Sequence, residues 1–184
     1  MEETAENTSE QRRRVAAVAQ HGVELFFRGH YEKALGYMDR ALALDPRFVR
    51  AYVGKALCLA QLGDPKKGAE MAARALALEP RSAIAYSARA LCRHRSGDQQ
   101  GAVLDYVNAI DLAPDDYRVY YNFACYWAER GDEAGCRRYL GHALELASTS
   151  FADIAAEDPD LARFSQKPWF KELVAEVKKK AAAK

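Results

Sequence analysis

The sequence predicts an all-α fold built from repeated helix pairs, and two observations carry that prediction. Ala occurs 35 times and Leu 17 times among the 184 residues, whereas Ile, Thr and Val together occur only 16 times. Helices favour the first group and strands favour the second. In addition, several columns of residues recur at intervals of 34, and a fixed period of this length is typical of stacked helical repeats.

The columns continue over four units. Glycine, alanine and leucine each keep the interval, and so do two columns of small residues: Gly29, Gly63, Gly97 and Gly131; Ala41, Ala75, Ala109 and Ala143; Leu44, Leu78, Leu112 and Leu146; Gly22, Ala56, Ala90 and Ala124; Ala34, Gly68, Ala102 and Cys136. Small residues at a helix crossing let two backbones approach closely. A column of large apolar residues holds Leu25, Leu59 and Trp127, but Arg93 interrupts it, and the sequence does not explain why.

Each unit is predicted to hold two helices. The glycine column supplies a left-handed stop for the first helix, and Asp64, Asp98 and Asp132 then follow as N-caps of the second. Pro46, Pro80 and Pro114 end the second helix, although Ser148 takes the fourth slot of this column.

On these columns the chain resembles the tetratricopeptide-repeat family from about Val15 to Ala147. The resemblance implies a right-handed superhelical α-solenoid in which the first helices of the pairs line a concave groove. We expect four repeats within residues 12–147, at about 15–48, 49–82, 83–116 and 117–150. Because a single pair cannot bury its apolar face, the pairs must stack, and the array needs caps at its ends.

Both ends differ from the repeats. Residues 1–11 are polar and acidic, so we expect a flexible N-terminal tail. Residues 151–184 are expected to form a C-terminal capping segment and basic tail, because Asp158-Pro159-Asp160-Leu161 and Pro168-Trp169-Phe170 resemble the closing segment of bacterial arrays of this family. One face of the predicted last helix carries only apolar side chains, from Trp169, Phe170, Leu173, Val174 and Val177. This face is suited to cover the open end of the array.

Composition narrows the function classes. With 49% hydrophobic and 29% charged residues the chain is predicted to be globular, and a net charge of +1 argues against a nucleic-acid-binding surface spread over the whole molecule. The N-terminus carries no apolar signal segment, and no apolar run is long enough to span a membrane. We therefore expect a cytoplasmic monomer that binds neither nucleic acid nor membranes, with Cys58, Cys92, Cys125 and Cys136 as reduced thiols.

The sequence contains no recognisable set of catalytic, cofactor-binding or metal-binding residues. His21, His30, His94 and His142 are scattered over different helices, and no H-E-x-x-H or phosphate-binding glycine motif occurs. The chain is therefore predicted not to be an enzyme.

The remaining candidate is a peptide-binding groove. The resemblance assigns its lining to first-helix residues outside the small columns: Val23, Phe26, Phe27, Arg50, Val53, Leu57, Ser87, Leu91, His94, Arg95, Arg118, Tyr121, Asn122 and Cys125. Exposed apolar side chains with arginines beside them suit a peptide that carries apolar and acidic residues. The carboxylate clamp of chaperone-binding members is missing, because its positions in the first three units hold Ala19, Val23, Gly54, Ile84 and Ala88.

The leading hypothesis is therefore a non-enzymatic adaptor that binds a partner peptide in the groove. Two alternatives stay open: a self-associating scaffold, and a regulatory repeat array of a larger enzyme complex.

Overall fold

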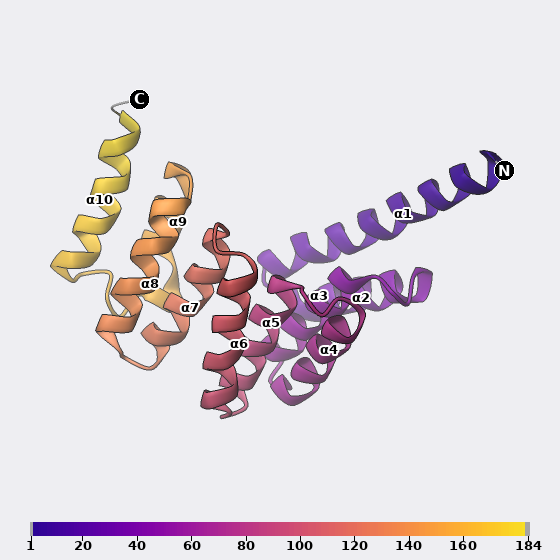
Figure 1. Ribbon diagram of the computed structural model, residues 1–184, viewed down its shortest axis with the longest axis horizontal. Coiled ribbons are helices and arrows are strands. Elements are labelled where there is room, and N and C mark those ends of the chain that lie inside the picture. Colours follow the sequence, from indigo (N-terminus) through magenta and orange to yellow (C-terminus); the bar gives the residue numbers. More distant parts are fainter. Residues whose placement is uncertain (1, 183–184) are drawn as a thin grey trace. The chain divides into compact units, whose positions relative to one another are not determined.

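The computed structural model describes residues 2–182, and it describes the side chains of residues 9–148 and 150–179. Within residues 2–182 the fold is all-α, as predicted, with no strand. The elements, labelled in Figure 1, are α1 (Glu2–Phe27), α2 (Tyr31–Leu44), α3 (Val49–Gln61), α4 (Pro65–Leu78), α5 (Ala83–Arg95), α6 (Gln99–Leu112), α7 (Tyr117–Glu129), α8 (Glu133–Leu146), α9 (Thr149–Glu157), the 3-10 helix η1 (Pro159–Leu161) and α10 (Pro168–Ala182).

The turns inside the pairs follow the predicted chemistry. Gly29, Gly63, Gly97 and Gly131 all have positive φ, between 75° and 93°, the left-handed conformation that ends a helix. The side chain of Asp64 accepts a hydrogen bond from the Lys67 backbone N–H, and the side chain of Asp132 accepts one from Gly135. These residues therefore stop one helix and begin the next.

By contact density the chain divides into two compact units, residues Met1–Asp105 and Tyr106–Lys184. In the first unit α1 packs on α2 and α3 packs on α4, and α3 also contacts both α1 and α5. In the second unit α7 packs on α8, and α10 contacts α8 and α9. Helix α6 begins in the first unit and ends in the second.

The core of the first unit is built largely from small side chains. Ala56, Ala72, Ala75 and Ala85 are fully buried in one cluster of α3, α4 and α5. A Cβ atom on Gly68 would lie 2.8 Å from both the Ala56 carbonyl oxygen and the Cys92 sulfur. The small columns therefore set how closely these helices approach one another.

The core of the second unit is aromatic. The rings of Tyr106 and Phe123 stack with their centroids 4.8 Å apart, and Tyr126 and Tyr139 pack against the same Phe123 ring. Large planar side chains bury more apolar area per residue than alanine does, and their ring pairs add a geometric preference.

The C-terminal segment is part of this second core. Phe164, Trp169, Phe170 and Val174 are buried in one cluster with residues of α7, α8 and α9. The Trp169 indole N–H donates to a Glu133 carboxylate oxygen at 2.7 Å, and Lys167 Nζ lies 3.0 Å from the other oxygen. The start of α10 is thereby fixed to the start of α8.

Helix α1 extends further than the sequence indicates. It begins at Glu2, so residues 2–11, where we expect a tail, belong to the same helix as Val15 (Figure 1). No Gly or Pro interrupts this stretch, and acidic residues are favourable in the first turn of a helix. Met1 and residues 183–184, including the end of the predicted basic tail, lie outside the described residues.

Candidate functional site

The odd-numbered helices of the first unit form a continuous layer, since α3 contacts both α1 and α5. We use the name odd-helix face for the predicted groove residues of this layer that are not buried, together with Ile84. Its members are Val23, Phe26, Phe27, Arg50, Leu57, Ile84, Leu91, His94 and Arg95.

Two large apolar side chains stand out on this face. Phe27 is 81% exposed and Ile84 is 50% exposed, while Val23, Leu57 and Leu91 are half-buried. Ile84 occupies one of the clamp positions and is not among the groove residues that the resemblance implies. Its interval of 34 from both Arg50 and Arg118 is the signal that could have placed it there.

The polar members of the face differ in how they are held. Arg95 donates to the Ala60 carbonyl at 3.2 Å, which links α5 to α3. His94 Nδ1 lies 2.9 Å from the Gln99 side-chain oxygen. Arg50 is exposed and takes part in no ion pair with the side chains that the structure describes.

Two predicted groove residues are in the core instead. Val53 is 3% exposed and belongs to the buried cluster of α3, α4 and α5, and Ser87 is 4% exposed. Helix α3 contacts α1, α2, α4 and α5, and α5 contacts α3 and α4, so much of the surface of these two helices is covered by their neighbours.

In the second unit, the predicted groove residues of α7 lie against the chain's own C-terminal segment. The Tyr121 ring packs edge-on to Phe151 of α9 at 4.8 Å, and its hydroxyl donates to Asp158. Cys125 packs against the same core cluster. Burial is the main reason that the pKa of Tyr121 is raised. Tyr121 and Cys125 are therefore less open than the sequence indicates.

The other two α7 residues are exposed. Asn122 faces solvent, whereas Arg118 is paired with Asp116, whose two carboxylate oxygens accept from its guanidinium at 2.8 and 2.6 Å. These hydrogen bonds from Arg118 hold the pKa of Asp116 below its usual range. The charge of Arg118 is thus already compensated.

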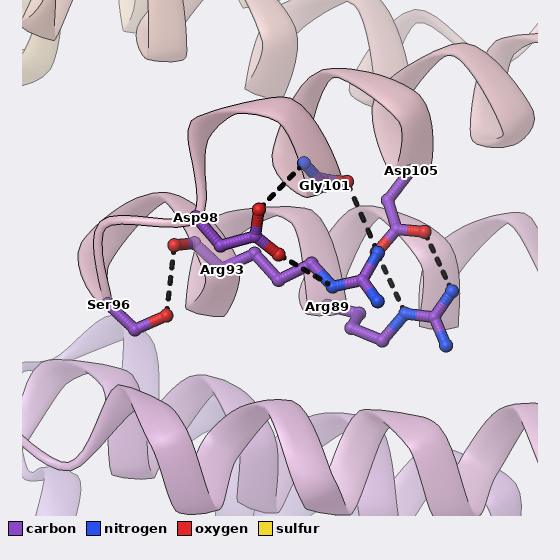
Figure 2. Close-up of polar contacts among 6 residues, drawn as sticks. All are labelled: Arg89, Arg93, Ser96, Asp98, Gly101 and Asp105. Carbon is purple, nitrogen blue, oxygen red and sulfur yellow. Dashed lines mark hydrogen bonds and ion pairs between the residues drawn. The ribbon is translucent and has the colours of Figure 1, made fainter.

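A charged cluster, drawn in Figure 2, fixes α5 to α6 and explains the interrupted apolar column. Asp105 is fully buried, and its carboxylate accepts from Arg89 at 2.8 and 2.7 Å and from Arg93 at 2.9 Å. Arg93 also donates to the Gly101 carbonyl at 3.3 Å. The hydrogen bonds to Asp105 raise the pKa of Arg89. The arginine at position 93 therefore replaces apolar packing with a buried ion pair.

The described residues offer little that resembles a reactive site. No group of three or more His, Cys, Asp or Glu side chains among them is arranged to hold a metal ion. Burial raises the pKa of the Cys58 thiol to about 11 and that of the Cys92 and Cys136 thiols to about 12. These thiols therefore stay protonated and poorly nucleophilic near neutral pH.

Comparison with known proteins decides the family. A tetratricopeptide-repeat family model matches residues 20–70 and 61–117, which together make up more than half of the chain. The chain belongs to the tetratricopeptide-repeat family. No curated protein is significantly similar to it in sequence.

Solved structures with the same fold include three informative members. A thermophilic tetratricopeptide-repeat protein from Thermus thermophilus is 20% identical with a TM-score of 0.67, covering 91% of this chain and 99% of that one. The first repeat domain of Spaghetti (RPAP3), bound to the HSP90 peptide SRMEEVD, is 18% identical with a TM-score of 0.55, covering 65% and 94%. An O-GlcNAc transferase mutant from Thermobaculum terrenum is 18% identical with a TM-score of 0.60, covering 78% of this chain and 26% of that one.

Within the described part of the chain, none of the helices combines the length and the apolarity that crossing a bilayer requires. Family membership supports a role in protein–protein interaction.

Proposed function

We propose that this tetratricopeptide-repeat protein is an adaptor that binds a peptide segment of a partner protein on the odd-helix face of its first unit. The observation that carries the proposal is the exposure of Phe27 and Ile84 on this face. Large apolar side chains in contact with water gain free energy when a partner covers them.

The arrangement of the face suits a peptide better than a small molecule. Leu57 and Leu91 come from neighbouring helices and are half-buried, so they offer shallow apolar contacts in addition to Ile84. The Spaghetti domain provides a precedent for the fold, since its structure was solved with a peptide bound.

The proposal also shifts the binding site away from α7. Tyr121 is engaged by Phe151 and Asp158, and Arg118 is compensated by Asp116. A partner would have to displace these contacts before it could use this helix, whereas the odd-helix face needs no such rearrangement.

The test uses a display library of random 12-residue peptides panned on the immobilised protein. Recovered peptides should bind the wild type and lose at least about tenfold in affinity on Ile84→Arg, since a central apolar contact contributes upwards of about 1.4 kcal/mol. Leu57→Arg should have the same effect. Because Ile84 is half exposed, its substitution should leave helical circular dichroism and the melting temperature nearly unchanged.

Glu70→Arg on α4 is the matched control, because Glu70 is exposed and lies outside the odd-helix face. The proposal is contradicted if the peptides bind the Ile84→Arg variant as tightly as the wild type but no longer bind the Glu70→Arg variant. That result would place the site on the even-numbered helices.

A further inference from the structure

Arginines gather at the starts of α3 and α5 and at the equivalent position inside α1. Arg47 and Arg81 occupy equivalent positions in the turns before α3 and α5, and Arg13 keeps the same interval of 34 on α1. We use the name arginine edge for these three and their exposed neighbours Arg12, Arg14 and Arg50.

Contacts in the first unit bring these residues to one side. The Gln11 side chain donates to the Leu44 carbonyl at 3.2 Å, which holds this part of α1 beside the turn that carries Arg47. Val15 of α1 is buried in a cluster against which Leu44 and Phe48 pack. The segment of α1 that contains Arg12, Arg13 and Arg14 therefore lies next to the α2–α3 turn.

The turn before α5 is the next neighbour along the same edge. Val49 and Ala85, in the first turns of α3 and α5, belong to one buried cluster. Packed helices lie roughly 8–10 Å apart. Arg81 is therefore within reach of a segment that also contacts Arg47 and Arg50.

The arginine edge has no ion-pair partner within the part of the chain whose side chains the structure describes. Among the described side chains, none of its six arginines takes part in an ion pair, unlike Lys55, which pairs with Asp39, and Arg89, which pairs with Asp105. The nearest described carboxylates in the sequence are Glu10, Asp45 and Glu79. Asp45 accepts from the Arg47 backbone N–H at 2.8 Å and so serves the turn.

The fourth repeat lacks this feature. At the interval of 34 from Arg81 it has Asp115, and the next residue, Asp116, pairs with Arg118. In the second unit the corresponding turn is therefore acidic or neutral, and the repeated arginine belongs to the first unit alone.

We propose that the arginine edge binds an acidic segment of a protein partner, continuous with the apolar segment on the odd-helix face. This inference rests on the proposed function. Arg50 belongs to both surfaces, so a peptide could place carboxylates on Arg47, Arg50 and Arg81. Its apolar side chains would then meet Ile84 at the start of α5, and Leu57 and Leu91 further along these helices. The planar guanidinium matches a carboxylate with two parallel hydrogen bonds.

A protein segment fits this surface better than a nucleic acid does. The whole chain has a net charge of +1, so it lacks the broad positive field that draws a polyanion to a protein. The exposed apolar side chains on the adjoining face also favour a ligand with apolar residues.

The experiment uses peptides recovered from the random library and compares the wild type with a double variant, Arg47→Glu and Arg50→Glu. On the wild type, recovered peptides should be enriched in Asp and Glu at least about twofold over the unselected library, because complementary charge steers binding. The dissociation constant of one such peptide should rise about tenfold on the double variant at low salt, and much less at high salt. Arg74→Glu on α4 is the matched control and should change little.

The outcomes separate the two proposals. Peptides without acidic enrichment that still depend on Ile84 would overturn the role of the arginine edge and leave the proposed function standing. Failure to recover any peptide on the wild type would overturn both. If a labelled single-stranded DNA oligonucleotide binds as tightly as the peptide and loses binding on the double variant, the edge is a nucleic-acid surface and this inference is wrong.

Discussion

The two compact units hold equivalent helix pairs together in different ways. In the first, α5 is fixed to α6 by the buried carboxylate of Asp105 and the guanidinium groups of Arg89 and Arg93. In the second, Trp127 of α7 occupies the repeat position of Arg93 and lies against Gly135 of α8, where a Cβ atom would be 2.7 Å from the indole ring. The rings of Phe123 and Tyr139 join the same two helices, with their centroids 4.3 Å apart. The same column therefore accepts either a buried ion pair or an aromatic contact.

The units also differ in what covers their odd-numbered helices. Helix α7 is contacted by η1 and packs against Phe151, whereas α3 and α5 leave Ile84 and Leu57 at least partly exposed. The repeat pattern thus specifies the helix pairs, while the binding surface remains only where the rest of the chain leaves it open.

The largest expected effect is loss of the C-terminal segment. Deleting residues 164–184 removes Phe164, Trp169, Phe170 and Val174 from the core of the second unit. Burial of four such side chains contributes roughly 6–12 kcal/mol as an upper bound. We expect a sharply lower melting temperature or aggregation, measured by calorimetry and size-exclusion chromatography. A truncated protein as stable and monomeric as the full chain would show that the aromatic core needs no cap.

Breaking the charged cluster should destabilise the first unit next most. Asp105→Ala leaves Arg89 partly buried without its counter-charge and leaves Arg93 with Asp98 alone, at 3.5 Å, which should cost about 3–5 kcal/mol in the free energy of unfolding. Asp39→Ala removes an exposed partner of Lys55 and should cost at most about 1 kcal/mol. Urea denaturation of both variants measures the contrast, and equal costs would contradict it.

A smaller loss of stability is expected at the repeat position that is Gly68 in the first unit and Cys136 in the second. Gly68→Ala places a methyl group 2.8 Å from the Ala56 carbonyl oxygen and the Cys92 sulfur, which should cost about 1–3 kcal/mol. Cys136→Ala at the equivalent position in the second unit only shortens a side chain. If Gly68→Ala instead stabilises the protein in urea denaturation, the helices have room to separate.

The smallest expected effect is a pH dependence at the start of α10. Hydrogen bonds from Lys167 and Trp169 hold the pKa of Glu133 below its usual range. Its contribution to stability is therefore present above the pKa of an unfolded glutamate, about 4.3, and is lost as the pH falls through the lower folded value. The melting temperature of Glu133→Gln should lie below that of the wild type at pH 7, and the gap should narrow below about pH 4. A gap independent of pH would exclude this ionic contribution.

Much of the fold follows from the sequence because its signals are local and periodic. Gly63 and Asp64 determine a turn by their own backbone preferences, and the interval of 34 repeats that turn along the chain. The buried face of α10 is likewise predictable from the spacing of Trp169, Phe170 and Val174.

The remaining features depend on contacts between residues far apart in the sequence. Arg93 is explained only when Asp105 is seen beside it, and Tyr121 is accessible or covered according to where Phe151 lies. Position within the 34-residue repeat assigns both Val53 and Leu57 to the groove. Helix packing, however, buries Val53 and leaves Leu57 half exposed.

The length of α1 has a consequence for how this protein can be handled. At about 1.5 Å per residue its 26 residues span about 39 Å, whereas the 14 residues of α2 span about 21 Å. The first turns of α1 therefore extend past the end of α2, the helix on which α1 packs (Figure 1). A fluorophore attached at the exposed Ser9 would move with this part of α1. Its anisotropy would therefore report whether a ligand bound at Arg12, Arg13 and Arg14 restrains the motion of the helix end.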